Sequence, residues 1–187
     1  MTDHRRTEMW RDETVETRED LLRPHLRAVV IGINPSRVSV EAGHYYQGRL
    51  GQLLFRRLRA VGLFDGAPRG EEDDVLFARG VGFTDLVKRP SRRPYELTSR
   101  DVAHGTAELG RKLASLDAPL LIFTYTRAAT ALYGPFAGAG FISRAGERPA
   151  RFVMPGPYAP RAVAGELLRE LREYIERELD AEAQLSS

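Results

Sequence analysis

The chain has 187 residues, no cysteine and a formal net charge of +2 at pH 7, with 42% hydrophobic residues. This size suits one domain with a buried core, and the lack of cysteine excludes thiolate zinc sites, iron–sulfur clusters, catalytic thiols and disulfides. No apolar run approaches the roughly 20 residues of a membrane-spanning helix, and the amino terminus lacks the hydrophobic centre of a signal peptide. We therefore expect a soluble, cytoplasmic protein that does not bind membranes.

The first twenty residues mix charges of both signs with few apolar side chains. This composition predicts a disordered or frayed segment over residues 1–20 and a single domain over residues 21–187. The uncharged run 28–31 is typical of a strand buried on both faces of a parallel sheet. Asn34 would follow its carboxyl end, where open α/β sheets bind ligands. Asn34 and Pro35 could equally form an ordinary turn.

Helical and strand patterns alternate along the rest of the chain. Apolar residues at helical spacing predict a helix that ends at Gly62, and a polar loop over 66–75 leads to a second short strand that ends near Asp85. Thr98, with Asp101 three residues later, resembles a helix cap. Further strands are expected at 118–126 and from residue 151, separated by a short helix, and the last helix starts near Val163. Together these elements predict a three-layer α/β/α domain with a mostly parallel sheet.

Basic residues gather in two parts of the chain. The loop 88–93 holds Lys88, Arg89, Arg92 and Arg93 without an acid, and four further arginines lie between residues 144 and 161. Such patches can bind the phosphates that supply much of the affinity for nucleic acid. The alternative is a solvated, arginine-rich surface.

Four segments in order, "EDLLRPHLRAVVIGINPS", "GHYYQG", "GFTDLVKRP" and "MPGPYAPR", resemble the mismatch-specific uracil/thymine DNA glycosylases of the uracil-DNA glycosylase superfamily. The resemblance covers most of the chain from about residue 19 and implies the superfamily's α/β fold. The family motif reads "GINPG", so Ser36 replaces a glycine here. The asparagine of that motif, here Asn34, positions the water that attacks the deoxyribose C1′.

An amide is a poor base, so Asn34 could orient a water but not easily accept its proton. Relatives commonly carry Lys or Asn at the position of Asp85. We expect this carboxylate to act as a second catalytic group, either by deprotonating the water or by stabilising an oxocarbenium-like sugar. The structural alternative is that Asp85 caps the turn after its strand.

The resemblance also implies which residues bind the extracted base. Tyr46 would stack on it, because base-flipping enzymes need a flat apolar surface to hold the base. Ser39 matches a small polar residue of the base pocket in some members, and Ile33, next to the catalytic asparagine, is assigned to the same pocket. Loop packing is the alternative for Tyr46.

The last segment matches the loop that relatives insert into the DNA. Efficient uracil glycosylases have a His at its start, whereas Met154 cannot donate a hydrogen bond to the departing base. Tyr158 is the expected wedge, flanked by Gly156 and Pro157. The DNA contacts expected besides the wedge are those of Arg161, Lys88, Arg92 and Arg93.

These residues predict a monofunctional DNA glycosylase that flips uracil, and possibly thymine or another damaged pyrimidine, from mispairs with guanine in base excision repair. Its partner would be double-stranded DNA, the protein would be a monomer, and neither a metal nor an organic cofactor is implied. Two alternatives remain open: a hypoxanthine- or purine-preferring glycosylase of the same superfamily, and a non-catalytic nucleic-acid-binding α/β module.

Overall fold

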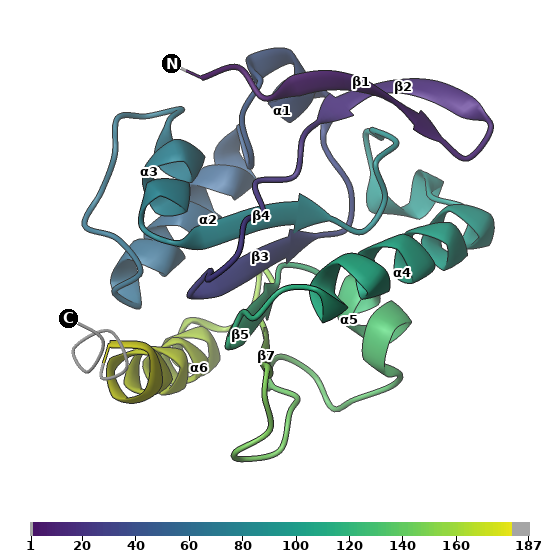
Figure 1. Cartoon of the computed structure of the whole chain (residues 1–187). Coiled ribbons are helices and arrows are strands. Elements are labelled where there is room, and N and C mark those ends of the chain that lie inside the picture. The colour runs from purple at the N-terminus through teal and green to yellow at the C-terminus, as the bar shows by residue number, and fades with distance from the viewer. Residues whose placement is uncertain (1, 181–187) are drawn as a thin grey trace.

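The uncharged run near the start of the domain forms β3 (Ala28–Gly32), an interior strand of a five-stranded sheet that is buried along its whole length. The computed structural model, which describes residues 2–180, orders this sheet β4-β3-β5-β7-β6 (Figure 1). Neighbouring strands run parallel except at one edge, where β6 is antiparallel to β7. The other strands are β4 (Val81–Asp85), β5 (Leu120–Phe123), β6 (Gly140–Phe141) and β7 (Ala150–Val153).

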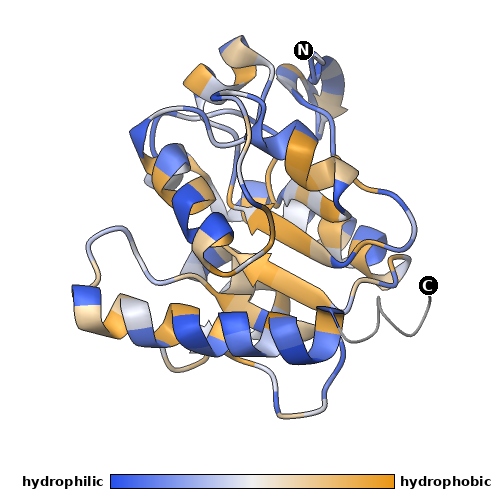
Figure 2. Ribbon diagram, turned by 90° about the vertical axis from the view of Figure 1, so that its left-hand side faces the viewer, coloured by the Kyte–Doolittle hydropathy of each residue, from blue (hydrophilic) through white to orange (hydrophobic). Residues whose placement is uncertain are grey.

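Helices cover both faces of the sheet. Successive side chains of each strand point to opposite sides, so an uncharged strand presents an apolar surface to both helical layers. Ala28 and Val30 of β3 pack into one hydrophobic cluster, whereas Val29 and Ile31 pack into the other. Figure 2 shows the hydrophobic strands enclosed between helices that carry many hydrophilic residues. The predicted three-layer α/β/α fold with a mostly parallel sheet is therefore confirmed.

The two helical layers differ in composition. The first cluster takes its helical residues from α2 (Arg49–Ala60), α3 (Glu72–Ala78) and α6 (Arg161–Tyr174), the last extended by a π-helical turn over Ile175–Leu179. The second takes them from α4 (Ser99–Ala114) and α5 (Thr126–Tyr133). A short 3₁₀ turn, Pro94–Glu96, precedes α4.

Helix caps explain where several helices begin. The expected cap before α4 is confirmed as a full capping box, in which Thr98 and Asp101 each bind the other's backbone N–H. Two short helices lie where the sequence predicts loops. In α1 (Arg37–Ala42), Ser36 caps the start and Gly43, at φ +71°, ends the helix. In α3, three acidic residues of the first turn favour the helix through its dipole, but the segment is too short for a clear periodicity.

Most of the amino-terminal segment forms strands, which differs from the disordered or frayed stretch expected over residues 1–20. Strands β1 (Arg5–Trp10) and β2 (Glu13–Arg18) form an antiparallel hairpin that lies outside the main sheet, near α1 (Figure 1). Trp10 and Val15 are buried in the same hydrophobic cluster as Leu109 of α4. A few well-placed apolar side chains therefore hold a segment whose average composition is polar.

Residues 181–187, which end the predicted single domain, lie outside the described residues. Within residues 2–180, no helix combines the length and apolar character needed to cross a bilayer.

Candidate active site

Asn34, the only asparagine of the chain, lies two residues beyond β3 and is held by its amide nitrogen. Nδ2 donates to the carbonyl oxygens of Pro35 at 3.2 Å and Arg89 at 3.1 Å, and to Ser91 Oγ at 2.9 Å. Because carbonyl oxygens only accept hydrogen bonds, these contacts fix which end of the amide is the nitrogen. Among the described residues nothing donates to Oδ1, which leaves this oxygen available to accept from a water molecule.

A pocket of about 450 Å³ opens beside the carboxyl ends of β5 and β7. Tyr46 lines it, and the centre of its ring lies 6.2 Å from those of Phe55 and Phe83. The Tyr46 hydroxyl lies 3.4 Å from Thr124 Oγ1, at the end of β5. The remaining wall includes residues of α2 and the segment after β7, among them Met154, Gly156 and Pro157. The structure thus brings together three of the predicted site residues, Tyr46, Gly156 and Pro157.

A comparison against protein families identifies the family of this chain. The model described as "Uracil DNA glycosylase superfamily" matches residues 19–179, from just after the hairpin to the end of the last helix. The chain belongs to the uracil DNA glycosylase superfamily. Membership implies a DNA glycosylase, a hydrolase of the N-glycosidic bond between a base and its deoxyribose, with DNA as the substrate.

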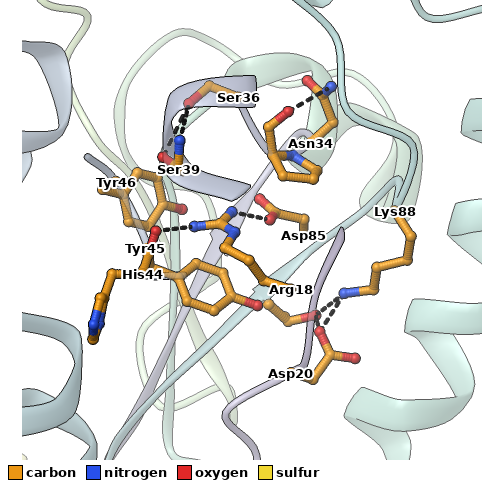
Figure 3. Close-up of polar contacts among 12 residues, drawn as sticks. Arg18, Asp20, Asn34, Ser36, Ser39, His44, Tyr45, Tyr46, Asp85 and Lys88 are labelled. Atoms are coloured by element: carbon orange, nitrogen blue, oxygen red, sulfur yellow. Dashed lines mark hydrogen bonds and ion pairs between the residues drawn. The ribbon is translucent and has the colours of Figure 1, made fainter. Parts of the chain in front are cut away.

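In this glycosylase Asp85, at the end of β4, is paired with a residue that precedes the matched region. Arg18 of β2 donates to Asp85 Oδ2 at 2.7 Å and to the His44 carbonyl at 3.0 Å, and its guanidinium lies 3.8 Å from the centre of the Tyr45 ring (Figure 3). Both charged side chains are 2–3% exposed. Burial raises the pKa of Asp85 above its ordinary value, and the positive charge of Arg18 opposes this rise.

Gly32 allows Asp85 and Tyr46 to approach the end of β3 together. A Cβ atom on this glycine would lie 2.0 Å from Asp85 Oδ1 and 2.9 Å from the Tyr46 hydroxyl. Asp85 is therefore next to the base-stacking candidate, although it does not line the pocket itself. Burial raises the pKa of Tyr46 strongly, and the nearby negative charge of Asp85 raises it further.

The segment after β7 follows the pocket wall to the surface. Met154 is buried, whereas Gly156, Pro157 and Tyr158 are exposed, the last by 91%. Arg161, also exposed, is the first residue of α6. The exposed residues are accessible to a large ligand such as DNA.

Arg57 of α2, which the sequence patterns did not single out, holds this segment in place. Its guanidinium donates to the carbonyl of Pro155 and, at 3.2 Å, to that of Gly156. Only the pairing of α2 with the segment after β7 reveals this role, since the two are separated by nearly a hundred residues.

The loop 88–93 divides into a buried and an exposed part. Lys88, predicted to contact phosphate, is 4% exposed, and its ammonium binds Asp20 and the Thr84 hydroxyl. The prediction for Lys88 is therefore wrong, because its charge is neutralised inside the protein. Arg92 and Arg93 are exposed. Ser91, missed by the sequence, is buried and contacts Asn34.

Two residues expected to bind the base have structural contacts instead. The Ile33 side chain is 1% exposed within the cluster beneath α4 and α5, so it does not line the pocket. Ser39 is 2% exposed, and its hydroxyl accepts from Ser36 Oγ at 2.9 Å and from the Gln47 N–H at 3.0 Å. These bonds stabilise α1 and the loop that carries Tyr46. Ser39 therefore supports the loop, whereas the sequence predicted that it contacts the base directly.

Proposed function

We propose that this glycosylase removes uracil, and possibly thymine or another damaged pyrimidine, from mispairs with guanine in double-stranded DNA. The observation that supports the proposal best is the fixed amide of Asn34, whose free Oδ1 can orient a water. A base turned out of the duplex would enter the pocket beside Tyr46 and stack on its ring. Tyr158 would fill the space left in the duplex.

The reaction is the hydrolysis of one bond. As the C1′–N bond of the deoxyribose breaks, its electron pair leaves with the base and positive charge develops on the sugar. Water oriented by Asn34 forms the new C1′–O bond and loses a proton to solvent or to the departed base, which left with the electron pair of the C1′–N bond. An amide is too weak a base to drive this loss, so attack would occur late, when the base has largely departed. Asp85, behind the pocket, would favour the charge on the sugar at a distance, an effect that the positive charge of its partner Arg18 reduces.

The lysine contacts support a monofunctional enzyme. A glycosylase that also cleaves the strand needs a free amine as nucleophile. The chain has two lysines, Lys88 and Lys112, and the ammonium groups of both bind the carboxylate of Asp20. Hydrolysis by water, without a covalent intermediate, agrees better with this arrangement.

A purine-preferring enzyme is the second candidate, and one observation favours it. Met154 forms part of the pocket wall where efficient uracil glycosylases carry a histidine. An apolar thioether cannot select for a uracil carbonyl by hydrogen bonding, so the pocket would tolerate other bases, including hypoxanthine.

A single-turnover excision assay tests both candidates, with duplexes that contain uracil, thymine, ethenocytosine or hypoxanthine opposite each normal base. We expect the fastest release from uracil opposite guanine, and Asn34→Ala should lower that rate by at least about a hundredfold without loss of DNA binding. Gln52→Ala is the matched control, because this amide of α2 binds Glu72 and does not line the pocket. Preferred release of hypoxanthine would support the second candidate. Absence of any abasic product would contradict both and favour a binding module.

A further inference from the structure

Two histidines and an aspartate from distant parts of the chain meet beneath the hairpin. His4 precedes β1, His44 follows α1 and Asp73 belongs to α3, and all three are at most 4% exposed. One potential metal ligand atom from each lies within 4.8 Å of the others. In Figure 3 the His44 ring points away from Arg18 and Asp85, so this cluster is separate from the candidate active site.

Outer hydrogen bonds orient these groups toward one another. Glu19 Oε1 lies 2.9 Å from His4 Nδ1, which directs His4 Nε2 to the centre of the cluster. The Tyr45 N–H donates to Asp73 Oδ2 at 2.7 Å, and Asp73 Oδ1 lies 3.0 Å from His44 Nδ1. A carboxylate on the far nitrogen of a ligating histidine is the usual outer contact of zinc sites in proteins.

Asp74 supplies a fourth candidate ligand. One of its oxygens lies 2.6 Å from His4 Nε2 and the other 3.9 Å from His44 Nδ1. Four ligands about 2.0–2.2 Å from a tetrahedral zinc ion are about 3.3 Å from one another. The 2.6 and 3.9 Å distances belong to different oxygens of Asp74, so its carboxylate would have to rotate to bring one oxygen to ligating distance beside both histidines.

The charges of the cluster favour a cation. Glu19, Asp73 and Asp74 provide three carboxylates, while histidines that bind a metal are neutral. A divalent cation would offset two of the three negative charges and would displace the protons that the imidazoles share with the carboxylates. Imidazole nitrogen is a good ligand for Zn²⁺ and a poor one for Mg²⁺ or Ca²⁺.

We propose that His4, His44 and Asp73, with Asp74 as fourth ligand, form a structural site for Zn²⁺ or a similar first-row divalent cation. The site joins the amino-terminal segment to α3 and to the loop that carries Tyr46, two residues after His44. Its role is to stabilise this part of the fold, and it takes no part in bond cleavage. The proposal rests on the cluster alone and does not depend on the proposed substrate.

Calorimetric titration of the chelator-treated full chain with ZnCl₂ tests the site. We expect one equivalent to bind and to raise the unfolding temperature, while MgCl₂ does neither. His4→Gln should weaken zinc binding by at least about a hundredfold, and Glu19→Gln by about tenfold, the scale of outer-shell changes. His25→Asn is the control, because His25 is exposed and Asn tolerates its φ of +58°.

Circular dichroism checks that the variants fold. If His4→Gln does not fold, Glu19→Gln still tests the site, because a half-exposed side chain can be changed with little effect on folding. The titration is run at a protein concentration of about 100 μM, where even a site with a Kd of that order would be detected. The proposal is overturned if the parent binds no zinc under these conditions. It is also overturned if Mg²⁺ binds equally well, or if a folded His4→Gln or Glu19→Gln variant binds zinc as tightly as the parent and the His25→Asn control.

Discussion

Ser91 Oγ accepts a hydrogen bond from Asn34 Nδ2 at 2.9 Å and donates one to the Arg93 carbonyl at the same distance. The orientation of the candidate catalytic amide therefore depends on the loop 88–93, whose Arg92 and Arg93 side chains are exposed. Contacts between these arginines and DNA phosphates would act on the same loop that holds Asn34.

Removal of the Ser91 hydroxyl tests this coupling. Ser91→Ala leaves Asn34 with its two carbonyl acceptors, so we expect the single-turnover excision rate to fall by about tenfold, the effect of one lost positioning bond. Ser115→Ala is the control, since that hydroxyl only binds the Lys112 carbonyl at the end of α4. A Ser91→Ala protein that excises at the parent rate would show that the carbonyls alone fix the amide.

The buried pair of Arg18 and Asp85 should make a large contribution to stability. Arg18→Met leaves the Asp85 carboxylate buried without its partner, and we expect a loss of about 3–5 kcal/mol in the free energy of unfolding near neutral pH. Arg5→Met, which removes an exposed, solvent-screened ion pair with Asp3, should cost far less. Denaturant unfolding measures both.

The pH dependence of this loss has a definite sign. Burial raises the pKa of Asp85, and the loss of Arg18 would raise it further, because the opposing charge is gone. The folded variant would then take up a proton as the pH falls through this raised pKa. Its deficit relative to the parent should therefore shrink in mildly acidic buffer. A deficit that stays constant would indicate lost packing, not an unpaired charge.

Asp85→Asn separates the charge of Asp85 from its shape. The amide oxygen can still accept the Arg18 hydrogen bond, but the buried guanidinium loses its counter-charge, so the variant should be less stable and is assayed where circular dichroism shows it folded. If the negative charge assists the reaction, excision should slow by roughly ten- to a thousandfold. In the parent the rate should fall as the pH drops through the raised pKa of Asp85, whereas the variant should lack this acid limb. An unchanged rate with the same pH profile would make the carboxylate structural.

Local patterns in the sequence predicted the sheet, the buried strand before Asn34 and the capping box of Thr98, because each depends on residues close together in the chain. The contacts of Lys88 could not be predicted in this way, since Asp20 is 68 positions away. Arg18 and Arg57 were missed for the same reason. The hairpin was not predicted because the average composition of the segment is polar, although the buried side chains of Trp10 and Val15 are enough to attach it to the domain.

Tyr158 provides a test of how the enzyme opens the duplex. This ring is 91% exposed, and Arg57 holds the backbone of the segment before it through the Pro155 and Gly156 carbonyls. If the ring fills the space of the flipped nucleotide, Tyr158→Ala should lose more activity on a duplex than on single-stranded DNA, where no base stack must be held open. Tyr158→Phe keeps the ring and should retain most of the duplex activity. Equal losses of Tyr158→Ala on both substrates would mean that the ring does not act as a wedge.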